Sequence, residues 1–418
     1  MTSAEKLAVI NQVIERCRVA SFYRNRLPDK PLAYLEDFKN IPLTTKEDLR
    51  QCSPLGLICV PKKELYQYHE SFGTSGTPVS AWLTKEDLRR YAKNINSGGL
   101  KFTKEDIVLI RFPYAISSIA HMVHLAAQSR KACVIPASSR SNVSPFPRII
   151  SLMQKLEVTV LACLPLQALL LAETAELMGY KPAKDFPNLR AILTAGEPLT
   201  SGKRRLLENI WDVPITDNFG MTEIGSAITD CEYGRAHPTE DDFIFEILKD
   251  DLKTDVKPGE VGHLVITTLK RKGTPVIRFW TEDRARIVPE ECPCGQRLTF
   301  KHHGRKKDII SINNRIIDIW DLDEIVSHFP CRRFWVVGPN LTGLQFVVEE
   351  EKSGDTINTS QIQKLEEKYG FKLEVEIVPK GSLYDRSELS SISAVGKPRY
   401  IYSAEEMQEK TYLKSTGI

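Results

Sequence analysis

The hydrophobic residues of this 418-residue chain change their spacing from one region to the next. In the first region, Leu7, Ile10, Val13 and Ile14 recur at helical spacing, which predicts an amphipathic helix near the N-terminus. Further on, short apolar runs at residues 107–112, 158–164 and 190–194 alternate with helical patterns at 147–156 and 165–178. This alternation of strands and helices predicts an α/β fold.

Two further patterns follow in the second half of the chain. Between about 241 and 288 the alternation is strictly two-residue, as in Phe243, Phe245 and Ile247, which predicts antiparallel strands in a small barrel-like part. Strand patterns at 334–337, 344–348 and 373–378 then surround a helical pattern at 360–369. We therefore predict a large N-terminal domain of α/β sheets with a barrel-like part (1–306), followed by a small α+β C-terminal domain (307–418).

Composition narrows the class of protein. The 57 basic and 54 acidic side chains leave a net charge of +3, which speaks against nucleic acid or a membrane surface as the main partner. The first 18 residues carry several charges where a signal peptide needs an apolar core, and the apolar run at 158–172 is too short to span a bilayer. With only nine cysteines, a reducing, cytoplasmic location is expected.

A segment rich in glycine and hydroxyl residues lies at 71–78. Its candidate phosphate-binding residues are Ser71, Gly73, Thr74, Ser75 and Gly76. Glycines let the backbone approach phosphates, while hydroxyl and N–H groups donate hydrogen bonds to them. Thr84 and Asp87, three residues apart, then predict the cap of a helix. No Gly-Lys-Ser/Thr follows, so this is not a Walker A loop, and a solvated turn is the alternative.

Other polar residues stand at turns that follow expected strands. They are Gly196, Glu197 and Pro198; Asn218, Phe219, Gly220, Thr222 and Glu223; Asp283; and Arg305. Open α/β sheets bind ligands at the carboxyl ends of their strands. Each segment alone also fits an ordinary turn or a surface charge, so their order along the chain is the informative feature.

In that order the motifs resemble the adenylate-forming superfamily of acyl-CoA synthetases and adenylation domains, and within it the phenylacetate-CoA ligase family. Residues 22–24 and 41–46 match the N-terminal pattern of that family, so the resemblance covers nearly the whole chain. It implies an ATP- and Mg²⁺-dependent ligase that converts an aryl or other small carboxylic acid into an acyl-adenylate and then into a thioester with CoA. One alternative is an adenylation enzyme that loads the phosphopantetheine of an acyl carrier protein, and another is a non-catalytic nucleotide-binding protein. Homodimers are a further expectation from the family.

The resemblance also implies roles for single residues. The 71–76 loop would hold the β- and γ-phosphates, Gly196 to Pro198 would lie beside the adenine, Thr222 would contact the α-phosphate, and Glu223 would hold Mg²⁺. Asp283 and Arg305 would bind the ribose. Lys397, in a Gly-Lys motif, is the candidate catalytic lysine. The small domain would be mobile about a hinge at Lys307, where the family often has Asp.

Two sets of residues remain for substrate and metal. Tyr114, His121 and His124 are candidates for the acid pocket, in a segment where the family is glycine-rich and this chain has no glycine. Cys231, His237, Cys292 and Cys294 together offer the three thiolates and one imidazole of a structural Zn²⁺ site, with a pair of reduced thiols as the alternative.

Overall fold

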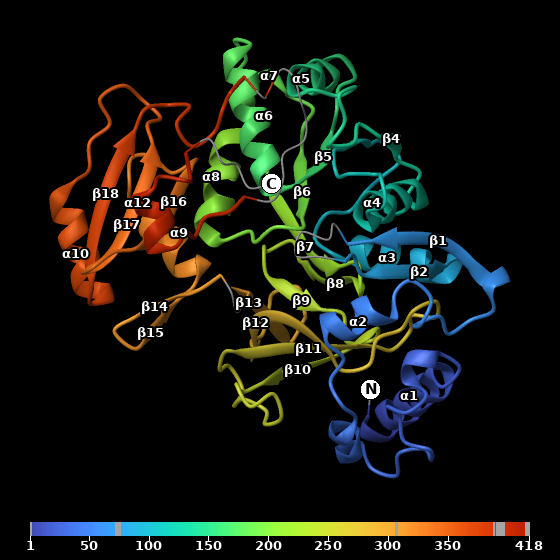
Figure 1. Cartoon of the computed structure of the whole chain (residues 1–418). Coiled ribbons are helices and arrows are strands. Elements are labelled where there is room, and N and C mark those ends of the chain that lie inside the picture. The colour runs from blue at the N-terminus through green and yellow to red at the C-terminus, as the bar shows by residue number, and fades with distance from the viewer. Residues whose placement is uncertain (1, 72–76, 306–307, 388, 390–397, 414–418) are drawn as a thin grey trace. The chain divides into compact units, whose positions relative to one another are not determined.

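A computed structural model describes residues 2–71, 77–305, 308–387, 389 and 398–413 (Figure 1). The chain divides into two compact units, Met1–Pro136 with Thr216–His302, and Ala137–Ile215 with His303–Ile418. Within the described residues, no helix is both long and apolar enough to cross a membrane. The predicted domain boundary between residues 306 and 307 falls outside the described residues and stays a prediction.

The first unit begins with helices and continues with short sheets. Its helices are α1 (Ser3–Cys17), η1 (Ser21–Tyr23), η2 (Leu35–Asn40), α2 (Lys46–Cys52), η3 (Lys62–Glu64), α3 (Lys85–Ser97) and α4 (Ser118–Ser129). Its strands are β1 (Leu65–Glu70), β2 (Ser80–Thr84), β3 (Ile107–Ile110), β4 (Cys133–Ile135), β7 (Ile215–Met221), β8 (Gly225–Asp230), β9 (Ala236–Pro238), β10 (Phe243–Leu248), β11 (Gly262–Thr268), β12 (Phe279–Pro289) and β13 (Leu298–Arg305). The last residues of β13 and the first residue of β7 belong to the second unit.

Local sequence signals account for the helices that the pattern predicted. In α1, Ile10, Val13 and Ile14 are buried in the core of the first unit, as their spacing predicted. Thr84 caps α3 in a capping box, because its hydroxyl accepts from the Asp87 amide while the Asp87 carboxylate accepts from the Thr84 amide. The two-residue pattern forms the antiparallel strands β10, β11 and β12, which are the expected barrel-like part.

The second unit contains an α/β segment and a small α+β segment. The first comprises α5 (Phe146–Lys155), β5 (Val160–Cys163), α6 (Pro165–Leu177), α7 (Pro182–Asp185), β6 (Ala191–Ala195) and α8 (Ser201–Trp211). The second comprises β14 (Ile310–Ile312), β15 (Arg315–Ile317), α9 (Ile319–Val326), β16 (Trp335–Pro339), β17 (Gly343–Glu349), α10 (Thr359–Tyr369), β18 (Lys372–Val378) and α12 (Ala404–Gln408). Strands β5 and β6 are parallel, and β17 pairs with β16 antiparallel and with β18 parallel.

The small α+β segment has a core of its own. Leu344, Phe346 and Val348 alternate along β17 and are completely buried, and Leu365 of α10 joins the same core. The three strands and the helix of this segment lie at the predicted places (Figure 1). The chain is therefore mixed α/β, as the apolar patterns indicated.

Candidate active site

The glycine- and hydroxyl-rich loop connects the two strands of a hairpin. Strands β1 and β2 are antiparallel, with Glu70 opposite Ser80. The Ser71 amide donates to the Val79 carbonyl at 2.9 Å, and the Val79 amide donates to the Ser71 hydroxyl at 2.9 Å. Both ends of the loop are thus fixed, whereas Gly73, Thr74, Ser75 and Gly76 lie outside the described residues.

Thr222 and Glu223 occupy the tight turn between β7 and β8. The sequence suggested a turn that already includes Asn218, but the chain is extended as far as Met221. Gly220 and Gly225 make this hairpin possible: a side chain on Gly220 would meet the Gly225 carbonyl at 2.3 Å, and Gly225 has a φ of +80°. The turn therefore needs small residues on both sides.

Glu223 has the features of a cation ligand. Its side chain is only 6% exposed, and within the described part of the chain its carboxylate has no hydrogen bond or ion pair. A buried carboxylate without a partner is costly, and a bound cation would remove that cost. Oxygen ligands of this kind fit Mg²⁺.

Arg271, which the sequence reasoning missed, makes hydrogen bonds with the backbone of this turn. The buried guanidinium donates to the backbone carbonyls of Thr222 and Glu223 and to the hydroxyl of Thr274. These hydrogen bonds involve the backbone carbonyls of Thr222 and Glu223 and not their side chains. No local motif marks such a residue, because the contact joins positions 48 residues apart.

Asp283 stands on β12 beside two aromatic rings. The Nε2 atom of His302, on β13, lies 3.2 Å from Asp283 Oδ1, and the Asp283 amide donates to the Thr281 hydroxyl at 3.1 Å. The Phe219 ring lies 5.3 Å from the His302 ring. Phe219, Asp283 and His302 thus form one cluster in the first unit, of which the sequence indicated the first two.

Asn218 has a structural role in the neighbouring strand. Its amide nitrogen donates to the Ser226 hydroxyl at 2.8 Å and to the Ile228 carbonyl at 3.3 Å, which ties β7 to β8. The side chain is buried and faces the partner strand, so it supports the turn rather than extending beyond it.

The second unit carries the Gly196 turn. Strand β6 ends at Ala195 and Gly196 has a φ of +83°, so the predicted turn at the end of a strand is present. The buried Glu197 carboxylate accepts from the Leu166 amide at 3.1 Å and so caps the first turn of α6. Pro198 follows, half-buried, and Arg305 ends β13, also half-buried. Lys307 and Lys397 lie outside the described residues.

The three candidate pocket residues lie together in the first unit. His121 and His124 are one turn apart on α4, the Tyr114 hydroxyl lies 3.1 Å from His124 Nδ1, and His121 Nε2 lies 3.0 Å from the Tyr114 carbonyl. The ring of His69 on β1, which the sequence reasoning missed, lies 5.2 Å from the His121 ring and is tilted by 56° to it. Burial lowers the pKa of His69 to about 4 and also lowers the pKa of His124, which favours the neutral form of these two imidazoles near neutral pH.

Cys231, His237, Cys292 and Cys294 also come together, with all four ligand atoms within 4.8 Å of one another. The sulfurs of Cys231 and Cys292 are 3.7 Å apart, close to the roughly 3.8 Å edge of a tetrahedron with Zn–S bonds of about 2.3 Å. His237 Nδ1 lies 2.6 Å from the Leu298 carbonyl, which fixes the ring and leaves Nε2 for a metal. The donor set fits Zn²⁺.

Two matching turns present these cysteines. In Cys231–Gly234 and in Cys292–Gly295, the glycine amide donates to the cysteine carbonyl, at 2.9 and 2.8 Å, and both glycines have positive φ. Burial opposes ionisation of Cys292, but hydrogen bonds from the Cys294 amide, Cys294 and His237 lower its pKa to about 7. Burial raises the pKa of Cys231 to about 11. One thiol of the cluster is therefore close to ionisation before any metal binds.

Comparison with known proteins now places the chain in a class. Residues 71–269, which include the hairpin loop, the Gly196 turn and the Thr222–Glu223 turn, match the family described as AMP-binding enzyme. This segment is therefore similar to the AMP-binding enzymes, as the order of motifs indicated.

The relatives narrow the class further. The chain is 31% identical over 286 residues to the phenylacetate-coenzyme A ligase of Thermus thermophilus (66% of this chain, 63% of the relative) and 30% identical over 290 residues to that of Pseudomonas putida (67% and 64%). The chain is thus similar to the phenylacetate-CoA ligases, as its motifs indicated. The matches span slightly less than two thirds of either relative.

A solved structure supports the fold class. A 2-hydroxyisobutyryl-CoA ligase in its postadenylation state superimposes with a TM-score of 0.84 over 98% of this chain and 91% of that one, at 20% identity. At that identity the likeness concerns the fold, and the predicted α/β class is confirmed.

Proposed function

We propose that the protein is an ATP-dependent acid–thiol ligase that forms an acyl-adenylate and then an acyl thioester of CoA. The buried Glu223 carboxylate, which has no partner among the described residues and lies in the segment that matches the AMP-binding family, carries this proposal. A protein that had kept the fold but lost catalysis would gain nothing from a buried carboxylate without a partner among the described residues. The curated relatives carry the name phenylacetate-coenzyme A ligase, which supports the same reaction.

The proposed chemistry has two balanced steps. A carboxylate oxygen of the acid attacks the α-phosphorus of ATP, the bond to the bridging oxygen breaks, and pyrophosphate leaves. The CoA thiolate then attacks the acyl carbon, the bond to the AMP oxygen breaks, and AMP leaves. The first step brings two anions together, so the protein must supply positive charge and hydrogen-bond donors there.

Residue roles follow from that need. The 71–76 loop would donate to the β- and γ-phosphates, Thr222 to the α-phosphate, and the backbone of residues 196–198 would contact the adenine. Asp283, held by His302, would accept from the ribose hydroxyls, with Arg305 assisting. Glu223 would bind Mg²⁺, which neutralises phosphate charge when present. Lys397 would stabilise the charge that develops during adenylate formation, and Lys307 would act as the hinge.

For the acid, we propose an aryl or other small carboxylic acid that is read by the Tyr114, His121 and His124 cluster. Tyr114 makes hydrogen bonds with both histidines, and burial lowers the pKa of His124, which favours shape selection over recognition of a second charge. CoA is the proposed acceptor. A carrier-protein phosphopantetheine, a homodimer and a cytoplasmic location stay predictions.

We also propose that Cys231, His237, Cys292 and Cys294 bind one structural Zn²⁺. Four protein ligands leave no open position, so the ion would fasten the β8–β9 and β12–β13 connections without activating water. The two matched turns and the 3.7 Å sulfur separation support this assignment.

Acid-dependent ATP/pyrophosphate exchange tests the reaction. A panel of aryl and short acids, phenylacetate included, is run first, followed by thioester formation with CoA or with a carrier protein. Lys397→Ala should lower the exchange rate by about a hundredfold or more while nucleotide binding persists. Lys352→Ala, an exposed lysine of the same segment, is the matched control. Exchange that equals wild type in Lys397→Ala would remove Lys397 from the mechanism, and no exchange with any acid would favour the non-catalytic alternative.

A further inference from the structure

Ile116 has a backbone conformation that its residue type rarely adopts. Its φ is +63°, and the Ser117 amide donates to the Ala115 carbonyl, two positions earlier, at 2.7 Å. A three-residue turn that is closed in this way over a residue with positive φ is the rare and strained class of γ-turn. A β-branched side chain increases the strain, because its Cβ carries two substituents. The turn at 115–117 therefore stores strain at a position that would suit glycine.

Two groups of β1 hold the 115–117 turn in place. The Glu70 amide donates to the Ile116 carbonyl at 3.1 Å, and His69 Nδ1 lies 3.0 Å from the same oxygen. A carbonyl can only accept, so Nδ1 carries the proton and donates it. His69 is buried, and burial lowers its pKa to about 4, which favours the neutral imidazole at pH 7. Both donors therefore fix the Ile116 carbonyl without adding charge.

The turn is attached to both groups of residues that the proposed reaction must bring together. On one side, the His69 ring lies 5.2 Å from the ring of His121, a candidate residue of the acid pocket. On the other side, Glu70 directly precedes Ser71, the first residue of the candidate phosphate loop. The carboxylate of the acid has to reach the α-phosphate, so the acid and the phosphates need neighbouring sites. Strand β1 therefore joins Ile116 to the residues proposed for each of these sites.

The Ile116 side chain is open to solvent although the chain around it is buried. Ile116 is 51% exposed, whereas Phe112 and Pro113 before it and Ser117 and Ser118 after it are buried. Backbone strain persists only where surrounding contacts maintain it, and it clusters at functional sites. Here two hydrogen bonds maintain a strained turn that presents an apolar side chain to water, which contributes little burial. A ligand that covered this side chain would supply the missing burial.

We propose that Ile116 is a specificity-determining residue that contacts the acid and limits its size, and that His69 is its positioning residue. A branched apolar side chain fills the space in which a larger substituent of the acid would lie. The geometry therefore favours a compact acid, with a small ring or a short branched chain, over an acid with a bulky substituent. This inference rests on the proposed function and deepens it by naming the size class of the substrate.

Thermal unfolding of the whole chain tests the strain without any substrate. Ile116→Gly should leave the thermal midpoint unchanged or raise it by about 2 °C, because glycine adopts positive φ without a clash and so offsets the loss of the side chain. Leu55→Gly is the matched control, because Leu55 is an apolar residue of the same unit that is 52% exposed and has no positive φ. This control should lower the midpoint by about 2 °C. An equal fall in both variants would overturn the proposal, because Ile116 would then be an ordinary surface residue.

Acid selectivity tests the role of the Ile116 side chain. ATP/pyrophosphate exchange is measured with the best acid of the panel and with a derivative that carries one more methyl group. Ile116→Gly should raise kcat/KM for the larger acid relative to the smaller one by about tenfold, which is the low end of what one methylene changes in an apolar pocket. Leu55→Gly should keep the wild-type ratio. A wild-type ratio in Ile116→Gly would overturn the proposal.

The same ratio tests His69. His69→Ala removes one of the two donors to the Ile116 carbonyl, so it should shift the ratio in the same direction, mainly through KM, while kcat at saturating acid changes little. His69→Asn keeps a side-chain N–H close to the position of Nδ1 and should restore most of the wild-type ratio. A fall in kcat with an unchanged ratio would indicate a merely structural role and overturn the assignment of His69.

The outcomes separate this inference from the proposed function. A wild-type protein that exchanges with no acid would reject the ligase function and this inference with it. An active wild type whose acid ratio is unaffected by both Ile116→Gly and His69→Ala would reject the inference alone.

Discussion

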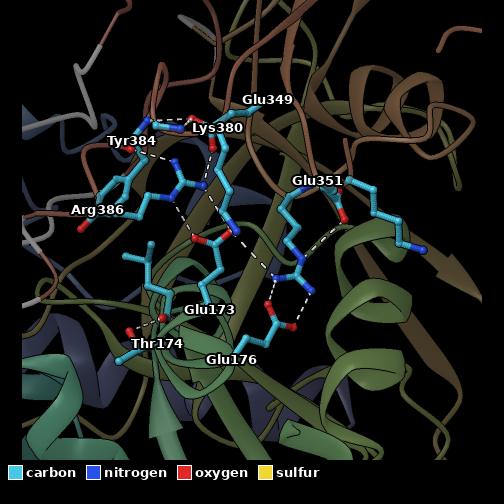
Figure 2. Close-up of polar contacts among 12 residues, drawn as sticks. Glu173, Thr174, Glu176, Glu349, Glu351, Lys380, Tyr384 and Arg386 are labelled. Atoms are coloured by element: carbon cyan, nitrogen blue, oxygen red, sulfur yellow. Dashed lines mark hydrogen bonds and ion pairs between the residues drawn. The ribbon is translucent and has the colours of Figure 1, made fainter. Parts of the chain in front are cut away.

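The cysteine cluster and the ion network between α6 and the small α+β segment, the α6 ion network (Figure 2), are both buried polar groups from distant segments, but they balance their charges in different ways. In the first, Cys231, Cys292 and Cys294 offer up to three negative charges with no basic side chain among the ligands, so the proposed balance comes from Zn²⁺. In the second, the acidic Glu173, Glu176, Glu349 and Glu351 lie among Arg333, Lys380 and Arg386, so all but one of the four negative charges are balanced by side chains of opposite charge. The difference teaches that the first region would depend on the Zn²⁺ that we propose, whereas the second is held together by its own side chains.

Removal of one cluster ligand should have the largest effect. Cys292→Ser should abolish stoichiometric zinc and lower the thermal midpoint of unfolding well beyond an ordinary point mutation, because structural zinc contributes on the order of 10 kcal/mol in small zinc domains. Metal analysis and calorimetry measure both. Cys133→Ser, an exposed cysteine outside the cluster, is the control. A Cys292→Ser protein with full zinc and unchanged melting would reject the site.

An intermediate effect is expected in the ion network. Arg386→Gln leaves Glu173 and Glu349 buried with less positive charge beside them and should cost about 3–5 kcal/mol of stability in the second unit. Denaturant unfolding followed by hydrogen exchange measures it. Arg399→Gln is matched to it, because Arg399 pairs with the more exposed Glu406 and should cost about 1 kcal/mol at most. An equal loss of stability in the two variants would mean that burial does not increase the contribution of the network to stability.

Salt should have the smallest effect and should separate the two regions. Raising NaCl from about 0.1 M to 1 M shortens the Debye length from about 10 to 3 Å, so exchange in α6 peptides should rise modestly through the partly exposed Arg333–Glu176 pair. Zinc content should not change. Loss of zinc at high salt, or hydrogen exchange in α6 that does not change with salt, would contradict this difference between the two regions.

The sequence predicted what local pattern or short motifs encode. Alternating runs located the strands of the small segment, and Thr84 with Asp87 marked a helix start, because these signals act over a few residues. The sequence also indicated the four Cys and His residues that the structure brings together as a candidate metal site, since Cys and His are rare and their chemistry narrows their use. The motif also placed Thr222 and Glu223 in a turn, although the strand before them is longer than expected.

Long-range contacts were invisible in the sequence. Arg271, His302 and the pair of Glu173 with Arg386 act across 19 to 213 residues, and charged side chains at such positions look like ordinary surface residues. Folding brings them together only after the sheets and α6 have packed. Glu197 illustrates the same point, because its cap on α6 could not be inferred from a glycine turn.

Helix α6 receives Glu197 at Leu166 and holds Arg333 at Glu176, ten residues further along. Ten helical residues measure about 15 Å, and a hydrogen-bonded helix resists compression along its axis. The turn after β6 and the Arg333 contact of the small segment therefore lie at opposite ends of the same helix. A displacement of one end of α6 should move the other end. Ligand binding at the β6 turn and docking of the small segment can therefore influence each other through this helix.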